Sequence, residues 1–185
     1  SAAEEHALRL FAVAAAYAKM HCGLKRVLII DWDVHHGNGT QSIFYDDPAV
    51  VFVSIHQKHH YPVDSGTVEE DGSGPGRGRT INIPLSAGTG DQGYLAALRQ
   101  IVVPVCRQFK PELILVSAGQ DAALYDPFGR NAVTYHGFAE MTKAVKALAE
   151  TCCDGRLLMV QEGGYNIVYQ PLSVLAILET LSDHT

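Results

Sequence analysis

Two acidic residues and a histidine alternate directly after a short apolar run near the start of the chain. Asp31, Asp33 and His35 follow residues 26–30 at intervals of two, a spacing that places side chains on one face of an extended backbone. Carboxylates and an imidazole together suit a divalent metal, and this mixed set favours zinc over iron, cobalt or manganese. The pattern therefore predicts a metal site at the end of the apolar run.

Two more polar clusters, residues 117–121 and 161–165, also follow apolar runs. Ligands of open parallel sheets bind beyond the carboxyl ends of the strands, so the three clusters are expected to converge. Asp121 then becomes the third ligand, and three protein ligands leave a position open, as in catalytic zinc sites. Tyr165, presented by the turn Gly163-Gly164, is expected to donate a hydrogen bond to the oxyanion of an attacked carbonyl. The alternative is that the acids and the histidine cap turns and that the tyrosine lies in the core.

Short apolar segments alternate with helical patterns along the whole chain, which predicts an α/β fold with a mainly parallel sheet. The expected strands are 26–31, 50–55, 80–84, 113–117 and 156–160. The expected helices are 3–22, a short one ending at Phe44, 91–109, 135–153 and 167–182. Asp91 is the expected N-cap of its helix, which Pro104 should end or kink. Residues 57–78 form a long loop, and loops of that length are usually functional or mobile.

The composition limits the class of protein. The chain has 185 residues, of which 47% are hydrophobic, and a net charge of −6, which fits one folded domain and argues against a direct nucleic-acid binder. The longest early apolar run, residues 10–18, is too short to cross a membrane. The four cysteines have no CxxC spacing, which favours reduced thiols and a cytoplasmic location, with the nucleus open to a eukaryotic protein.

Taken together, residues 25–175 resemble the zinc-dependent histone deacetylase family, especially its class II-like and bacterial amidohydrolase members. The segments that carry the resemblance are 30–41, 53–56, 82–84, 117–127 and 162–165. The resemblance implies a three-layer arginase/deacetylase-like α/β fold with a mainly parallel sheet. It also implies that residues 1–185 are the C-terminal part of a single deacetylase domain, so that the sheet is incomplete here and the N-terminal half of the domain is its partner.

The resemblance assigns roles to individual residues. It implies zinc ligands Asp33, His35 and Asp121, with Tyr165 as the hydrogen-bond donor of the transition state. It implies a structural potassium ion bound by Asp31, Asp33, His35, Ser54 and Ile55, and an acyl-lysine tunnel lined by Tyr61, Gly163 and Gly164. Two-metal arginases carry a further Asp where this chain has Gly37, so the pattern favours a single-metal enzyme.

The implied reaction is removal of acetyl groups from acetyl-lysine in histones or other proteins. Two alternatives stay open, namely hydrolysis of an acetylated polyamine or other small amide, and a non-catalytic metal-binding fragment or interaction module. Members of the family use a pair of adjacent histidines, upstream of the Asp-x-Asp-x-His motif, as general acid and base. Upstream of Asp31 this chain has only His6 and His21, and His59-His60 is a poor substitute. The chain alone is therefore expected to be weakly active or inactive.

Overall fold

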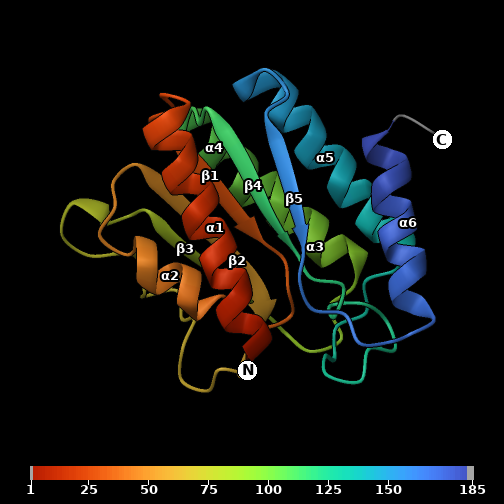
Figure 1. The fold of residues 1–185 in the computed structure, drawn as a ribbon. Coiled ribbons are helices and arrows are strands. Elements are labelled where there is room, and N and C mark those ends of the chain that lie inside the picture. The colour runs from red at the N-terminus through yellow and green to blue at the C-terminus, as the bar shows by residue number, and fades with distance from the viewer. Residues whose placement is uncertain (1, 183–185) are drawn as a thin grey trace.

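Five parallel strands form a single sheet at the centre of the fold (Figure 1). The computed structural model describes the backbone of residues 2–182 and the side chains of residues 11–182. The strands are β1 (Val27–Asp31), β2 (Val50–Gln57), β3 (Thr80–Leu85), β4 (Leu113–Ala118) and β5 (Leu157–Gln161). Their order in the sheet is β3-β2-β1-β4-β5, with every neighbouring pair parallel. The prediction of an α/β fold with a parallel sheet is confirmed.

Helices cover both faces of the sheet (Figure 1). One face carries α1 (Ala2–His21) and α2 (Asn38–Phe44), and the other carries α3 (Asp91–Ala97), α4 (Val103–Phe109), α5 (Tyr135–Cys153) and α6 (Tyr169–Leu181). Side chains of β1 alternate between the two faces, because successive residues of a strand point to opposite sides. Val27 and Ile29 join the core with α1 and α2, whereas Leu28 and Ile30 join the core with α3, α4, α5 and α6. The result is a three-layer architecture.

The expected helix 91–109 consists of three segments. A π-helical turn, η2 (Leu98–Val102), separates α3 from α4, and Pro104 lies in the first turn of α4. The interruption expected at this proline is confirmed, and the wider turn accommodates its missing N–H and its bulky ring. Gly90 is the N-cap of α3, so the prediction that Asp91 caps it is wrong. Asp91 instead accepts hydrogen bonds from Thr134 N at 2.7 Å and Thr134 Oγ1 at 2.8 Å, tying α3 to the start of α5.

Strand β1 ends at Asp31, and the next residues fold into bends. The extended backbone assumed for Asp33 and His35 is therefore wrong, and bends bring these side chains together instead. Asp31 pairs in register with Ser54 on β2 and Ser117 on β4. Because β1, β4 and β5 are parallel neighbours, the polar segments that follow them leave the sheet at the same edge (Figure 1).

All four cysteines are free thiols, with Cys106 and Cys153 buried and Cys22 exposed. Among the helices of residues 2–182, none combines the length and the apolar character that a membrane span requires.

Gly66 in the loop after β2 approaches two buried histidines. It has a φ of +77°, and a Cβ there would lie 2.6 Å from His56 Nε2 and 2.7 Å from His36 Cγ. Gly78 has the same φ of +77°, with no atom within 4 Å of such a Cβ. We expect Gly78→Ala to cost about 1 kcal/mol of backbone strain, and Gly66→Ala to cost about 1–3 kcal/mol more through overlap. Urea denaturation of both variants measures the difference, and equal losses would contradict tight packing at Gly66.

Candidate metal centre

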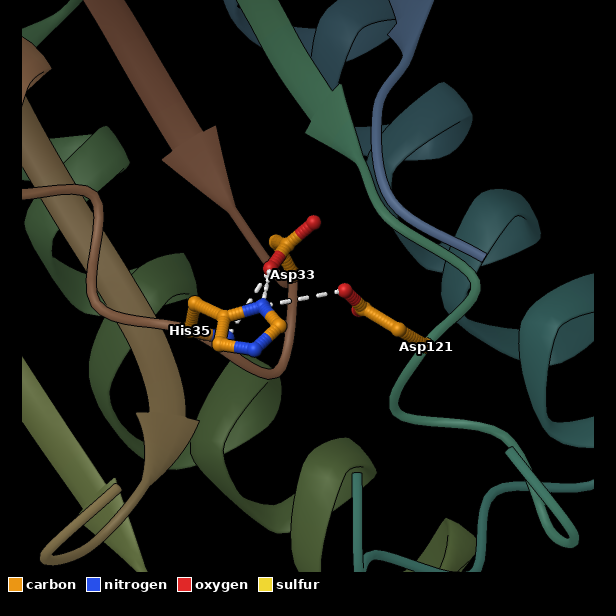
Figure 2. A group of neighbouring side chains, drawn as sticks. All are labelled: Asp33, His35 and Asp121. Atoms are coloured by element: carbon orange, nitrogen blue, oxygen red, sulfur yellow. Dashed lines mark hydrogen bonds and ion pairs between the residues drawn. The ribbon is translucent and has the colours of Figure 1, made fainter. Parts of the chain in front are cut away.

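Asp33, His35 and Asp121 form one compact cluster at the carboxyl edge of the sheet (Figure 2). His35 Nδ1 lies 2.9 Å from Asp33 Oδ1 and 3.1 Å from Asp121 Oδ2. One ligand atom from each residue lies within 4.8 Å of the other two. Asp33 and His35 come from the loop after β1, and Asp121 from the loop after β4. The structure therefore brings together all three predicted zinc ligands.

Backbone N–H groups fix the orientation of the two carboxylates. Asp121 Oδ1 accepts a hydrogen bond from Val34 N at 2.8 Å. Asp33 Oδ1 accepts from His35 N at 2.9 Å, and Asp33 Oδ2 accepts from Gly163 N at 3.0 Å. The last bond joins the loop after β5 to the cluster. These donors hold the ligand set in place without using all of its lone pairs.

Two glycines make room for the carboxylates. A Cβ at Gly163 would overlap Asp121 Oδ2 and would lie 2.6 Å from Asp33 Oδ2. A Cβ at Gly119 would overlap Asp33 Oδ2 and would lie 2.6 Å from Asp33 Cα. Neither oxygen is free to retreat, because each belongs to the hydrogen-bonded cluster. The loops after β4 and β5 can therefore approach the cluster this closely only with glycine at both positions.

The electrostatics of the cluster favour a cation. Burial raises the pKa of Asp121 to about 7, and the neighbouring charge of Asp33 adds to this effect. Burial works against charge on His35, but its hydrogen bonds to Asp121 and Asp33 raise its pKa to about 10. Burial and Asp33 also raise the pKa of Glu162 to about 7. A proton on His35 therefore balances part of the negative charge, and a metal cation would take the place of that proton.

The donor chemistry of the three residues fits zinc. Zinc accepts imidazole nitrogen and carboxylate oxygen together, and catalytic sites supply three protein ligands. The half-buried Asp33 and His35 reach the surface, whereas Asp121 is fully buried. A metal held here would thus be open to a substrate from one side only.

Tyr165 is connected to this cluster through Gly163, whose N–H bonds Asp33 Oδ2, and it is not a core residue. It follows Gly163 by two positions, and Gly164 between them has a φ of +138°. Its backbone N donates a hydrogen bond to Asp126 Oδ2 at 2.8 Å. Its ring packs edge-on against Phe128, with 4.8 Å between centroids, and 45% of the residue is exposed. The alternative of a buried tyrosine is therefore wrong, while the catalytic role stays a prediction.

Aromatic rings from the loop after β2 pack on His35. The ring of Tyr61 meets it edge-on at 6.1 Å between centroids, and the ring of His60 stacks on it at 5.0 Å. His60 Nε2 also lies 2.6 Å from the carbonyl oxygen of Phe128, which makes this nitrogen the donor. Tyr61, assigned to a tunnel from the resemblance, thus lies at the metal centre. The tunnel itself stays a prediction.

Only some of the residues assigned to potassium have side chains that lie together. Asp31 is buried, and its Oδ1 accepts a hydrogen bond from Asp33 N at 3.0 Å. Ser54 is its neighbour on β2, but Ser54 Oγ is 2.9 Å from His56 Nδ1, and the side chain of Ile55 lies in the core. Burial and the charge of Asp33 raise the pKa of Asp31 well above its ordinary value. The potassium site stays a prediction.

Sequence reasoning missed the role of Asp126. Its Oδ1 accepts a hydrogen bond from Phe128 N at 2.9 Å, and its Oδ2 accepts from Tyr165 N at 2.8 Å. One carboxylate thus joins the loops after β4 and β5 beside the metal centre. The available signal was the Asp126-Pro127 pair, which is typical of a turn in which the aspartate bonds nearby backbone N–H groups.

Curated proteins of known family match most of this chain. A probable deacetylase of Archaeoglobus fulgidus is 48% identical over 160 residues, which cover 84% of this chain and 44% of that protein. A histone deacetylase-like amidohydrolase of Pseudomonas aeruginosa is 43% identical over 171 residues, which cover 92% of this chain and 45% of that protein. The chain thus spans less than half the length of these relatives.

Solved structures agree with the sequence matches. The HD domain of HDA15 superimposes with a TM-score of 0.86 at 40% identity, covering 94% of this chain and 49% of that one. The structure of the histone deacetylase Clr3, a protein of Schizosaccharomyces pombe, gives 0.85 at 42% identity, covering 91% of this chain and 29% of that one. Residues 9–181 match the histone deacetylase domain. The chain, with its three-layer fold and its cluster of two aspartates and a histidine, belongs to the histone deacetylase family.

Proposed function

We propose that this chain is the metal-binding part of a zinc-dependent amide hydrolase that removes acetyl groups from acetyl-lysine in proteins. The observation that carries the proposal is the meeting of Asp33, His35 and Asp121 within 4.8 Å at the carboxyl edge of the sheet. The names of the relatives, a deacetylase and an amidohydrolase, support the reaction class.

The chain's own residues would act around the metal. Zinc held by Asp33, His35 and Asp121 would supply a Lewis acid that polarises the amide carbonyl and lowers the pKa of water. The phenol of Tyr165 would donate a hydrogen bond to the negative charge that develops on the acetyl carbonyl oxygen. The bond from Tyr165 N to Asp126 fixes the backbone from which that phenol projects. Potassium, if bound by Asp31 and its neighbours, would offset the buried negative charge.

We propose that the isolated chain turns over slowly because it lacks a general base. His60 is a candidate, since its ring stacks on His35. However, its Nε2 is bonded to the carbonyl oxygen of Phe128. A base must reach the proton that it removes, and this nitrogen is turned to the backbone instead. The histidine pair of the family would therefore come from a part of the protein outside these residues.

We propose that the rest of the domain packs against β5 and α6. Strand β5 is an edge of the sheet, and Leu158 on it is 47% exposed. A cavity of about 110 Å³ between β5 and α6 is lined by Met159, Val174, Ile177 and Leu178. Leu158 is in register with Leu115, which belongs to the core under α1 and α2, so it lies on the face opposite the cavity. Parallel sheets are normally covered on both faces, so both faces at the β5 edge call for a partner. The length of the relatives beyond the matched region supports the rest of the domain as that partner.

Replacing Leu158 with Glu tests this packing. In the isolated chain we expect Leu158→Glu to reduce self-association at high concentration, with a change below about 0.5 kcal/mol in the free energy of unfolding. In a protein that contains the whole domain, the same change should cost about 2–4 kcal/mol, because it buries an unpaired charge. Val68→Glu, an exposed loop position, is the matched control. Equal costs in the short and long proteins would contradict packing at β5.

The substrate is tested by acetate release from two compounds. A protein with the whole domain should hydrolyse an acetyl-lysine peptide faster than an acetylated polyamine. Two acids of the stretch 69–71 already have partners, since Glu70 bonds Thr67 N at 2.9 Å and Asp71 lies 3.5 Å from Arg77. This favours the peptide over a free polycation. Faster hydrolysis of the polyamine would overturn the peptide assignment, and bound zinc without any turnover would favour the interaction module.

A further inference from the structure

A polar network lies next to the metal centre but contains none of its ligands. It joins α2 and β3 to the segment 58–72 of the long loop, and its side chains are those of His36, Gln41, Ser65, Glu70 and Asn82. His36, Gln41 and Asn82 are buried. Buried polar networks constrain structure strongly when their members are satisfied, so this network can fix the elements and the loop that it joins.

Gln41 is the centre of the network, and its amide has one orientation. Gln41 Nε2 donates to Glu70 Oε2 at 2.5 Å, and a carboxylate can only accept. Gln41 Oε1 must then face the other way, where it accepts from Asn82 Nδ2 at 2.8 Å and from His36 Nε2 at 3.0 Å. The hydrogen of His36 is thereby assigned to Nε2. Glu70 therefore sets the amide of Gln41, and the amide sets the tautomer of His36.

His36 connects this amide to the loop beside the metal centre. Its Nδ1 lies 2.9 Å from Ser65 Oγ, and its backbone N donates to the carbonyl oxygen of Tyr61 at 3.3 Å. The same loop places the rings of Tyr61 and His60 against His35. A chain of hydrogen bonds thus runs from Glu70 through Gln41 and His36 to Ser65 and to the backbone of Tyr61, in the loop that carries the two rings.

Glu70 and Asn82 hold the far end of the loop at Thr67. Glu70 Oε1 accepts from Thr67 N at 2.9 Å, and Asn82 Nδ2 lies 3.2 Å from the carbonyl oxygen of Thr67. The loop is therefore fixed near Tyr61, at Ser65 and at Thr67, all through Gln41 or its direct partners. Loss of the Gln41–Glu70 bond would release several of these contacts together.

We propose that Gln41 is a positioning residue of the metal centre, which, through Glu70 and His36, holds the loop of His60 and Tyr61 against His35. The metal part of this statement rests on the proposed function, whereas the loop part does not. Partners of metal ligands typically change metal affinity 10–100-fold when they are removed. Gln41 acts through an intermediate loop, so an effect of about tenfold is expected.

Exchanging the donor and the acceptor of the Gln41–Glu70 bond distinguishes a positioning role of Gln41 from a general loss of stability. Glu70→Gln breaks the bond because it places an amide donor against Gln41 Nε2, while its Oε1 still accepts from Thr67 N. Gln41→Glu breaks it because it places a second carboxylate against Glu70. The double variant Q41E/E70Q restores the bond with donor and acceptor exchanged, while the glutamate still accepts from His36 and Asn82. Glu69→Gln removes the same charge one residue away, at an exposed position, and is the matched control.

The variants are compared by two measurements on the 185-residue chain. Competition with a chelator should give a zinc Kd about tenfold weaker in each single variant, and within about threefold of the unchanged chain in Q41E/E70Q and in Glu69→Gln. Hydrogen exchange should rise at least about tenfold at residues 61–67 in the single variants, leave β1 and β4 unchanged, and recover in the double variant.

The outcomes distinguish this proposal from the proposed function. If the unchanged chain binds no zinc, the metal centre fails, while hydrogen exchange still decides whether Gln41 holds the loop. If zinc binds but the single variants keep both its Kd and the protection of residues 61–67, the role of Gln41 is overturned. A double variant as impaired as the single ones, or an equal rise of exchange throughout the chain, would also overturn it.

Discussion

Replacing Asp121 with Asn is expected to weaken zinc binding by more than about 100-fold. Asp121 supplies the fully buried carboxylate of the cluster, and its Oδ2 faces His35 Nδ1 at 3.1 Å. Removal of outer partners of a metal ligand already costs 10–100-fold in affinity, so loss of a charged ligand should exceed this range. Competition with a chelator of known affinity measures the zinc Kd in both proteins.

The same change should leave the fold intact. An asparagine Oδ1 can still accept the hydrogen bond from Val34 N that Asp121 Oδ1 accepts at 2.8 Å. Asparagine Nδ2 would lose the bond with His35 Nδ1, but burial and Asp33 already raise the pKa of Asp121 to about 7, so removing an unfavourable buried anion offsets that loss. Asp64→Asn is the control, because Asp64 is exposed and its φ of +63° suits asparagine. Unchanged zinc affinity in Asp121→Asn would show that the metal lies elsewhere.

Tyr165→Phe should reduce kcat by about 10²–10³-fold in a protein that contains the whole domain, the range for loss of one oxyanion donor. The change removes only the hydroxyl. The ring can keep its edge-on contact with Phe128, and the bond from the backbone N to Asp126 is unaffected. A group that acts in the transition state lowers kcat and kcat/KM together, so KM should stay within about threefold. Steady-state acetate release from an acetyl-lysine peptide measures both constants.

A control variant and a zinc-affinity measurement test whether the loss of kcat comes from the phenol of Tyr165. Tyr125→Phe removes the hydroxyl of an exposed tyrosine whose ring lies edge-on to Tyr169, and it should leave kcat unchanged. Zinc affinity of the 185-residue chain should also be the same with Phe at position 165, because Tyr165 is not a ligand. A Tyr165→Phe protein with full kcat would exclude the phenol from the reaction.

Local patterns in the sequence were sufficient to predict a parallel α/β sheet and to place Asp33, His35 and Asp121 in one cluster, whereas the three layers were implied by the family resemblance. Buried parallel strands such as β1 and β2 are continuous apolar runs, which sequence shows directly. Because such strands end at a common edge, polar residues at 33–35 and 121 could be assigned to one site although 86 residues separate His35 from Asp121. Strand direction alone places these residues at one edge, and the alternation of strands with helices indicates that direction.

The details that failed depend on contacts between distant segments. Asp91 looks like an N-cap locally, but Thr134 offers it two donors that no local pattern contains. The contact of His60 with Phe128 spans 68 residues, and that of Gln41 with Glu70 spans 29. Side-chain hydrogen bonds of this kind are decided by how loops pack on the finished sheet. A sequence without its fold therefore gave His60 little weight and gave Gln41 none.

The most direct test of the metal centre is anomalous diffraction at the zinc edge from a crystal of the zinc-loaded chain. We expect one strong anomalous peak between Asp33, His35 and Asp121, at about 2.0–2.2 Å from His35 Nδ1 and from an oxygen of each carboxylate. Zinc peaks only at surface histidines, with no peak at these three residues, would contradict this prediction.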